Sequence, residues 1–188
     1  MILLARHGET RDNAPPVRFM GSRDTPLGPA GEAQAHGLAE AVASQRLRVV
    51  WTSHLQRARQ TAQIVADALA LEVRVDERLA ESHRGDWEGR LVADIEREDP
   101  AGWAAWRRAG AGFRFPGGES LAEHQERVLD ALGDIAAGPL PALVVCHGGT
   151  IRCAVAATRP GGLAAFHEPD VPHAAVLRFE PSALTGAR

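Results

Sequence analysis

The sequence predicts an α/β fold: a three-layer αβα sandwich with a mostly parallel, doubly wound central sheet and a small helical cap. Short apolar runs of strand length alternate with stretches of helical period. The run over 142–146 is apolar throughout, as expected of a strand buried on both faces. Two apolar runs end in His-Gly, which places polar chemistry at the carboxyl end of the sheet, where open α/β sheets bind ligands.

Each element follows from a local pattern. The apolar runs predict strands over 2–5, 48–52, 71–75, 142–146 and 174–179. The helical pattern predicts helices over 30–46, 55–69, 91–98, 101–108, 121–137 and 150–157. Ser53 is expected to cap the second helix, and Ser120 with Glu123 forms a capping box for the fifth. The prolines and glycines of 8–28 predict a long irregular loop, and residues 90–116 form the cap.

Composition limits the domain count and the chemistry. The 188 residues, 45% hydrophobic and 24% charged, predict one domain over 1–188. The net charge of -3 gives no footprint for nucleic acid, and no apolar stretch is long enough for a membrane, so we expect a cytoplasmic protein without either partner. The chain has no Lys and no Tyr, and all 21 cations are Arg. This excludes Schiff-base chemistry, a Walker A lysine and a tyrosine acid.

The two His-Gly strand ends predict a phosphoryl-transfer site. If both strands are central and parallel, His7 and His147 emerge side by side. The strand 48–52 leads into a helix that carries Arg57, and Arg6 precedes His7. Imidazoles, guanidiniums and helix N-termini at one rim suit an anion, and a nearby carboxylate can supply a proton. His83 and His173 fall in loops that could reach the cleft, whereas His36, His54, His124 and His167 are expected on solvated faces.

The motifs resemble the histidine phosphatase superfamily, in its phosphoglycerate-mutase-like branch, over nearly the whole chain. The resemblance begins with Arg6-His7-Gly8-Glu9-Thr10 and Asn13 and continues with Gly21-Ser22-Arg23-Asp24-Thr25-Pro26-Leu27 and Gly31. It goes on through Ser53-x-Leu55-x-Arg57-Ala58-x-Gln60-Thr61-Ala62, Leu79-x-Glu81-x-x-x-Gly85-x-Trp87-Glu88-Gly89, Gly117-Gly118-Glu119-Ser120 and Val145-x-His147-Gly148-Gly149. The order and separation of these motifs make the set specific.

The resemblance implies a role for each matched position. His7 would attack phosphorus and form a phosphohistidine, and Glu81 would protonate the leaving oxygen and then activate water. Arg6, Arg57 and His147 would bind the phosphoryl oxygens, while Asn13, Gly21 and Gly148 would complete the phosphate pocket. Glu119 and Ser120 would support the site from behind and order an Arg. The family chemistry implies no cofactor and no metal. The small-phosphatase branch is favoured.

Two departures argue against the mutase alternative, a cofactor-dependent phosphoglycerate mutase. Mutases carry a hydroxyl residue where this chain has Met20. They also carry a longer insertion than the 90–116 cap, and a short cap excludes water poorly, so hydrolysis should win. The expected partner is a small soluble phosphate ester, for which Trp103 and Trp106 of the cap are either contacts or anchors of the cap helices. The sequence leaves a homodimer open.

Three other functions compete with this interpretation. Cys146 and Arg152 have the spacing of a cysteine-dependent phosphatase, although a buried structural Cys explains the residue as well. A metallohydrolase could use His7, His147 and Glu81 as ligands, but the neighbouring Arg6 and Arg57 would repel a cation. A non-catalytic phosphate-binding protein on the same fold would lack the His or the Glu of the set. A metal-independent phosphomonoesterase is therefore the main prediction.

Overall fold

The computed structural model describes residues 1–13 and 15–180, so residues 14 and 181–188 of the expected single domain lie outside the described part. Its strands are β1 (Ile2–Arg6), β2 (Val49–Thr52), β3 (Val73–Val75), β4 (Ala142–Cys146) and β5 (Val176–Phe179). Its α-helices are α1 (Pro29–Val42), α2 (Gln56–Leu69), α3 (Val92–Glu98), α4 (Pro100–Arg108), α5 (Leu121–Ala136) and α6 (Gly148–Ala156). The predicted elements are all present, with ends displaced by a few residues.

The five strands form one sheet in the order β3-β2-β4-β1-β5. β1 and β2 both run parallel to β4, and β3 runs parallel to β2, whereas β5 is antiparallel to β1 at the edge. The fully apolar β4 is the central strand, because its neighbours cover both of its edges and its side chains are buried on both faces.

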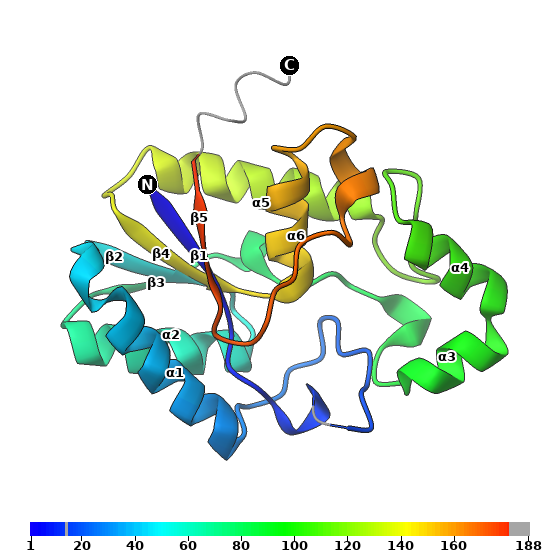
Figure 1. Cartoon of the computed structure of the whole chain (residues 1–188), viewed down its shortest axis with the longest axis horizontal. Helices are drawn as coiled ribbons and strands as arrows, with labels where there is room; N and C mark the ends of the chain where they lie inside the picture. Colours follow the sequence, from blue (N-terminus) through cyan, green and yellow to red (C-terminus); the bar gives the residue numbers. More distant parts are fainter. Residues whose placement is uncertain (14, 181–188) are drawn as a thin grey trace.

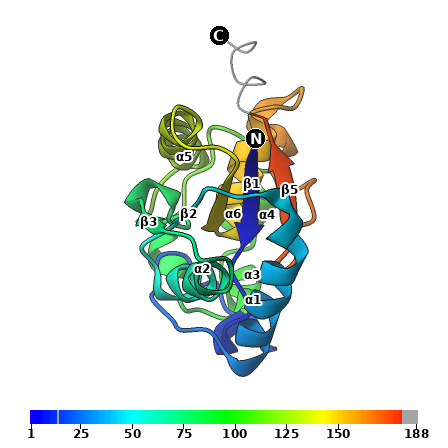
Figure 2. The ribbon, with the colours of Figure 1, turned by 90° about the vertical axis from the view of Figure 1, so that its left-hand side faces the viewer.

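Helices cover both faces of the sheet, α1 and α2 on one and α5 and α6 on the other (Figures 1 and 2). The alternation of side chains along β1 fixes the assignment, since Ile2 and Leu4 pack with α5 and α6 while Leu3 and Ala5 pack with α1 and α2. This arrangement confirms the mostly parallel αβα sandwich.

The end of the first helix and the conformation of several loops differ from the sequence prediction. The first helix ends at Val42 and tightens into a 3-10 turn, Ala43–Gln45, instead of continuing to residue 46. Four more 3-10 helices interrupt the loops, namely Arg11–Asn13, Glu77–Leu79, Gly85–Trp87 and Gly162–Ala165. These single turns have no apolar periodicity that a sequence pattern could reveal.

The segment 90–116 carries α3 and α4, which lie beside the carboxyl end of the sheet and away from its layers (Figure 1). Its two ends meet, because the amide of Asp86 donates to the carbonyl of Pro116 at 2.8 Å. Its inner face packs against Phe19 and Trp87 in a cluster of aromatic rings, the cap cluster, to which the segment contributes Trp103, Trp106, Phe113 and Phe115. Trp103 and Trp106 thus anchor the cap helices, since they pack within this cluster.

Candidate active site

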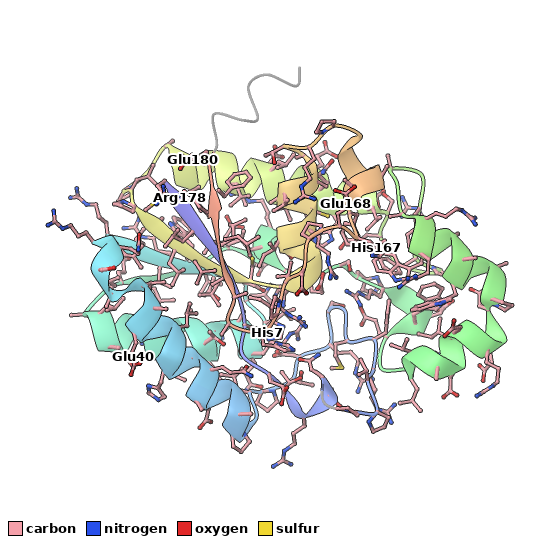
Figure 3. All side chains as sticks on the ribbon, in the orientation of Figure 1. His7, Glu40, His167, Glu168, Arg178 and Glu180 are labelled. Atoms are coloured by element: carbon pink, nitrogen blue, oxygen red, sulfur yellow. The ribbon has the colours of Figure 1, made fainter. Side chains whose placement is uncertain are left out.

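The parallel pairing of β1 and β4 brings His7 and His147 together. Their ring centroids lie 5.1 Å apart, and the amide of His7 donates to the carbonyl of Cys146 at 3.0 Å. Figure 3 shows His7 where β1 ends, in the middle of the molecule. Both residues are buried, since His7 is 4% exposed and His147 is 0% exposed.

The hydrogen bonds of His7 determine its tautomer. Its Nδ1 lies 2.7 Å from the carbonyl oxygen of Gly8, which can only accept, so the proton sits on Nδ1. The lone pair is then on Nε2, which accepts a hydrogen bond from Nε of Arg57 at 3.2 Å. Burial and the Arg57 guanidinium hold the pKa of His7 well below its ordinary value, so the ring is neutral at physiological pH.

Arg57 connects His7 to the backbone at the wall of the site. Its Nη1 and Nη2 donate to the carbonyls of Arg23 and Gly21 at 2.6 and 2.8 Å. Both carbonyls belong to residues 17–23, the entrance segment. Burial lowers the pKa of Arg57 to about 10, so the guanidinium stays charged at neutral pH. Gly21 has a φ of 55°, and a Cβ there would fall 2.4 Å from Oε1 of Glu88.

Glu81 is clamped by donors on both carboxylate oxygens. Oε1 accepts from the amide of Ser82 at 2.9 Å, and Oε2 accepts from the amide of Gly149 at 3.0 Å and pairs with Arg84 at 3.4 Å. Burial alone would raise the pKa of Glu81. Arg84, His124, His147 and the Gly149 amide outweigh it and hold this pKa well below the usual range. Without ligand, Glu81 is a carboxylate.

Ser53 does not cap the helix as predicted. Helix α2 begins at Gln56 after Leu55, and Oγ of Ser53 accepts the amide of Leu55 at 3.2 Å while lying 2.9 Å from Nε2 of His147. The Ser53 hydroxyl therefore lies within hydrogen-bond distance of the imidazole of His147. Nδ1 of His147 is buried without a partner among the described residues, and burial lowers the pKa of the ring.

A cavity of about 170 Å³ lies beside these groups and is strongly cationic. Its lining includes the guanidinium residues Arg6, Arg18, Arg57, Arg84 and Arg152, together with His7, Asn13, Gly21, Glu81, Gly148 and Gly149. Nη1 of Arg6 donates to the carbonyl of Val171 at 2.8 Å, but its Nε is buried and unpaired within the described residues. Oδ1 of Asn13 accepts from Thr10, which leaves the Asn13 amide group as a donor at the cavity wall.

Glu119 orders an Arg, in line with the role that the family resemblance implies. Its two oxygens bond Arg127 at 2.6 and 3.1 Å, and Nη1 of Arg127 donates to the carbonyls of Arg78 and Ala80. A further donor of Arg127 reaches the carbonyl of Glu81 at 3.2 Å. The chain leading into Glu81 is thus fixed from behind, while Ser120 forms the expected capping box with Glu123.

The other histidines divide differently from the prediction. Nδ1 of His173 lies 3.0 Å from the carbonyl of His7, so this loop does reach the site, whereas His83 is exposed and contributes only backbone contacts. His124 was expected on a solvated face, and this is wrong: its side chain is fully buried, with Nε2 3.2 Å from Oγ1 of Thr150. Burial lowers the pKa of His124 to about 4.

Sequence reasoning missed Arg84, Phe19 and the position of Arg152 in the cavity wall. Arg84 and Phe19 lie in loops with no periodicity, and Arg152 was noticed only through its spacing from Cys146. The Cys146 thiol itself lies in the hydrophobic core with Leu4, Val144 and Ile151, and burial raises its pKa far above the ordinary value. This environment disfavours a thiolate nucleophile.

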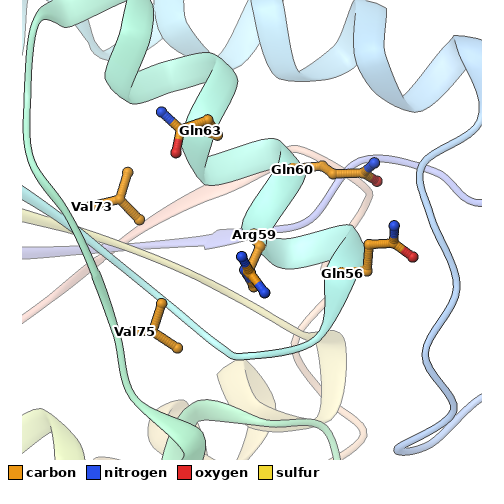
Figure 4. A pocket seen from close by; sticks show the side chains of 6 residues that line it. All are labelled: Gln56, Arg59, Gln60, Gln63, Val73 and Val75. Carbon is orange, nitrogen blue, oxygen red and sulfur yellow. The ribbon is translucent and has the colours of Figure 1, made fainter.

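A second hollow lies on the outer surface, between α2 and β3 (Figure 4). It has a volume of about 490 Å³ and is lined by Gln56, Arg59, Gln60, Gln63, Val73 and Val75. It shares no lining residue with the cationic cavity.

No helix in the described part of the chain has the length and apolar character needed to cross a membrane. The described residues contain no group of three or more His, Cys, Asp or Glu that could hold a metal ion.

Comparisons with known proteins agree with this geometry. The family model described as "Histidine phosphatase superfamily (branch 1)" matches residues 2–185. The probable phosphoglycerate mutase GpmB of Yersinia enterocolitica is 40% identical over 159 residues, which are 81% of this chain and 71% of that protein. The GpmB of Serratia proteamaculans is 38% identical over 174 residues, 89% of this chain and 77% of that one.

Solved structures match nearly the whole chain. YhfR of Bacillus stearothermophilus has a TM-score of 0.85 and 31% identity, covering 93% of this chain and 88% of that one. The mycobacterial glucosyl-3-phosphoglycerate phosphatase in complex with VO3 has a TM-score of 0.83 and 31% identity, with the same shares of 93% and 88%. A putative alpha-ribazole-5'-P phosphatase from Escherichia coli has a TM-score of 0.78 and 28% identity, covering 93% and 87%.

Proposed function

This chain belongs to branch 1 of the histidine phosphatase superfamily, and we propose that it is a metal-independent phosphomonoesterase of small soluble phosphate esters. One observation carries the proposal. The Nδ1–H group of His7 is bonded to the Gly8 carbonyl, so a neutral Nε2 lone pair stands at a cavity lined by guanidiniums. An uncharged nucleophile beside fixed cations suits attack on a phosphoryl group.

In the first step, Nε2 of His7 forms a bond to phosphorus as the ester P–O bond breaks. Glu81 gives its proton to the leaving oxygen, and the alcohol departs. Arg6, Arg57 and His147 hold the phosphoryl oxygens, with Asn13, Gly21 and the Gly148 amide completing the pocket. These donors stabilise the charge that spreads over the oxygens in the transition state.

In the second step, Glu81 takes a proton from water, and the water oxygen attacks the phosphohistidine. The P–N bond breaks, inorganic phosphate leaves, and His7 regains its neutral lone pair. Because Glu81 is a carboxylate in the ligand-free site, its first proton must arrive with the substrate. A phosphate monoester has a second pKa of about 6, so its monoanion can carry that proton at mildly acidic to neutral pH.

The comparisons support hydrolysis and leave one alternative. The solved neighbours include proteins named as phosphatases of glucosyl-3-phosphoglycerate and of alpha-ribazole-5'-P, whereas the sequence relatives are named probable phosphoglycerate mutases. Hydrolysis is favoured because the cap is formed by two short helices and because Met20, not a hydroxyl residue, lines the cavity.

Release of inorganic phosphate from a panel of metabolite phosphates tests the proposal, with and without exhaustive chelation. We expect turnover of several small esters that chelation does not change and that His7→Ala abolishes. Rapid interconversion of 2- and 3-phosphoglycerate, dependent on a bisphosphate primer and without net phosphate release, would establish the mutase instead. Loss on chelation with recovery on Zn²⁺ or Mg²⁺ would favour a metallohydrolase. Phosphate binding without turnover of any ester would identify a binding protein.

A further inference from the structure

Arg84 stands between the proposed acid and the cap. Its Nη2 lies 3.4 Å from Oε2 of Glu81, and its Nε donates to Oγ of Ser82 at 3.1 Å. The carbon of its guanidinium lies 4.3 Å from the centroid of the Phe19 ring. Its side chain is only 14% exposed. The contacts with Glu81, Ser82 and Phe19 therefore fix the orientation of the Arg84 guanidinium.

The Phe19 contact links Arg84 to the whole cap cluster. The Phe19 ring lies 5.6 Å from Trp87, 5.9 Å from Trp106 and 6.2 Å from Phe115, measured between centroids. An aromatic face stabilises a cation placed over it. The position of the guanidinium, and through it that of Glu81, thus depends on how the cap packs.

Arg84 also faces the cavity. It belongs to the lining of the cationic cavity, and its Nη1 has no hydrogen-bond or ion-pair partner among the described residues. The guanidinium can therefore hold Glu81 through Nη2 and meet an anion in the cavity through Nη1 at the same time. No other cation in the described part of the chain forms an ion pair with Glu81.

We propose that Arg84 is a positioning residue for Glu81: it holds the carboxyl toward the leaving oxygen and shares its charge with the incoming phosphoryl group, so that Glu81 can take up a proton. This rests on the proposed function. As the phosphate neutralises Arg84, the force that keeps Glu81 ionised weakens. Binding of the substrate then prepares the acid that the first step requires.

Other groups face Glu81 from every neighbouring element, and none of them makes the same contact. These titratable groups lie on β1, α2, α5, the end of β4 and α6, and they are Arg6, Arg57, His124, His147 and Arg152. The charge of Glu81 also contributes to the raised pKa of the Cys146 and Cys153 thiols. Among the groups that lower the pKa of Glu81, Arg84 is the strongest, although burial opposes it.

The test compares Arg84→Met, which keeps a long apolar side chain without the charge, with Arg84→Lys and the control Arg59→Met. Arg59 is an exposed residue of α2 beside the outer hollow (Figure 4). The Glu81 carboxyl is titrated by ¹³C NMR in each protein without substrate. We expect its pKa to rise by about one unit or more in Arg84→Met, a tenfold gain in proton affinity. Arg84→Lys should restore part of the difference, and Arg59→Met should match the unmodified protein.

The kinetic arm uses glycerol 3-phosphate, whose leaving group needs a proton, and p-nitrophenyl phosphate, whose leaving group does not. Arg84→Met should lower kcat for glycerol 3-phosphate about tenfold more than for p-nitrophenyl phosphate. An unchanged Glu81 titration, or equal losses on both esters, overturns the proposal. If the unmodified protein hydrolyses no ester of the panel, the proposed function fails, while the titration still decides the role of Arg84. If Arg84→Met does not fold, Arg84→Lys and Phe19→Leu carry the same measurements, with a smaller shift in the same direction.

Discussion

Nε of Arg57 donates a hydrogen bond to Nε2 of His7 across 3.2 Å. The bond occupies the lone pair that we assign to the attack on phosphorus, so it must be exchanged when a phosphoryl group arrives. Nη1 and Nη2 keep the guanidinium fixed during this exchange, because both bond the entrance segment. We expect the freed Nε–H to donate to a phosphoryl oxygen instead.

Arg57→Lys should therefore lower kcat/KM by about 10² or more, because lysine keeps the charge and loses the planar fork. The measurement is the initial rate on p-nitrophenyl phosphate. Arg59→Lys, two residues along the same helix and exposed, is the matched control and should keep the unmodified rate. A loss of less than threefold in Arg57→Lys would show that charge alone is sufficient.

His7→Ala should lower the turnover rate by about 10³-fold or more, because it removes the imidazole whose Nε2 lone pair we assign to the attack on phosphorus. Circular dichroism should show an unchanged fold. Cys146→Ala should keep most of the activity, since that thiol lies in the core and not at the cavity. A mutant pair with the reverse outcome would assign the nucleophile to Cys146.

Glu81→Gln should slow hydrolysis of alkyl phosphates far more than that of p-nitrophenyl phosphate. Glutamine can accept only one of the two amide hydrogen bonds, from Ser82 or from Gly149, because its NH2 group donates, and it has no proton of suitable acidity to give. Rates on both esters at pH 6 give the ratio, and we expect it to change by about tenfold or more. The same loss on both substrates would assign Glu81 a structural role only.

Gly149→Ala should displace Glu81 without unfolding the protein. A Cβ at this position would lie 2.2 Å from Oε1 of Glu81, so the carboxylate has to leave its clamp. We expect the loss to be greater for alkyl esters than for p-nitrophenyl phosphate, in the same sense as in Glu81→Gln. Gly133→Ala is the control, because a Cβ on that helical glycine meets nothing within 4 Å. Full activity of Gly149→Ala on alkyl esters would contradict the clamp.

The buried His124 predicts how stability depends on pH. Its pKa is about 4 in the folded protein and about 6.5 when unfolded, so the unfolded chain binds the proton more tightly. The stabilisation is complete above pH 6.5 and is lost as the pH falls toward 4, with an upper bound of about 3 kcal/mol. The lowered pKa values of His7 and His147 make the folded protein less stable at acidic pH in the same way. Urea unfolding between pH 7.5 and 4.5 should show the decline, and His124→Gln should flatten it. An equally steep decline in His124→Gln would show that His124 does not titrate in this window.

Much of the site could be predicted because it lies where sequence patterns are strongest. The two His-Gly turns follow apolar runs, so the topology alone brings His7 beside His147. The burial of His124 could also have been predicted. It lies three residues after Leu121 and four before Val128, on the buried stripe of α5 that continues to Ile135. Because histidine is polar, this core position was assigned to a solvated face.

Arg84 and Ser53 could not be assigned in the same way. Arg84 gains its role from Phe19, which is distant in the sequence and lies in an irregular loop. Ser53 has the sequence context of a helix cap, yet α2 begins three residues later and the Ser53 hydroxyl lies 2.9 Å from Nε2 of His147. In both cases a contact between distant segments overrides the local preference, and no pattern in the sequence encodes that contact.

The cap leaves and rejoins the body of the protein at one point, where the amide of Asp86 meets the carbonyl of Pro116 and the amide of Glu119 meets the carbonyl of His83. The free-energy cost of closing this loop therefore depends little on the loop's length. The entropy of closing a loop grows only logarithmically, by about 0.6 kcal/mol for each doubling. Insertions or deletions between these anchors that spare the cap cluster can thus change the volume and chemistry that face the ester while the phosphoryl-binding groups stay in place.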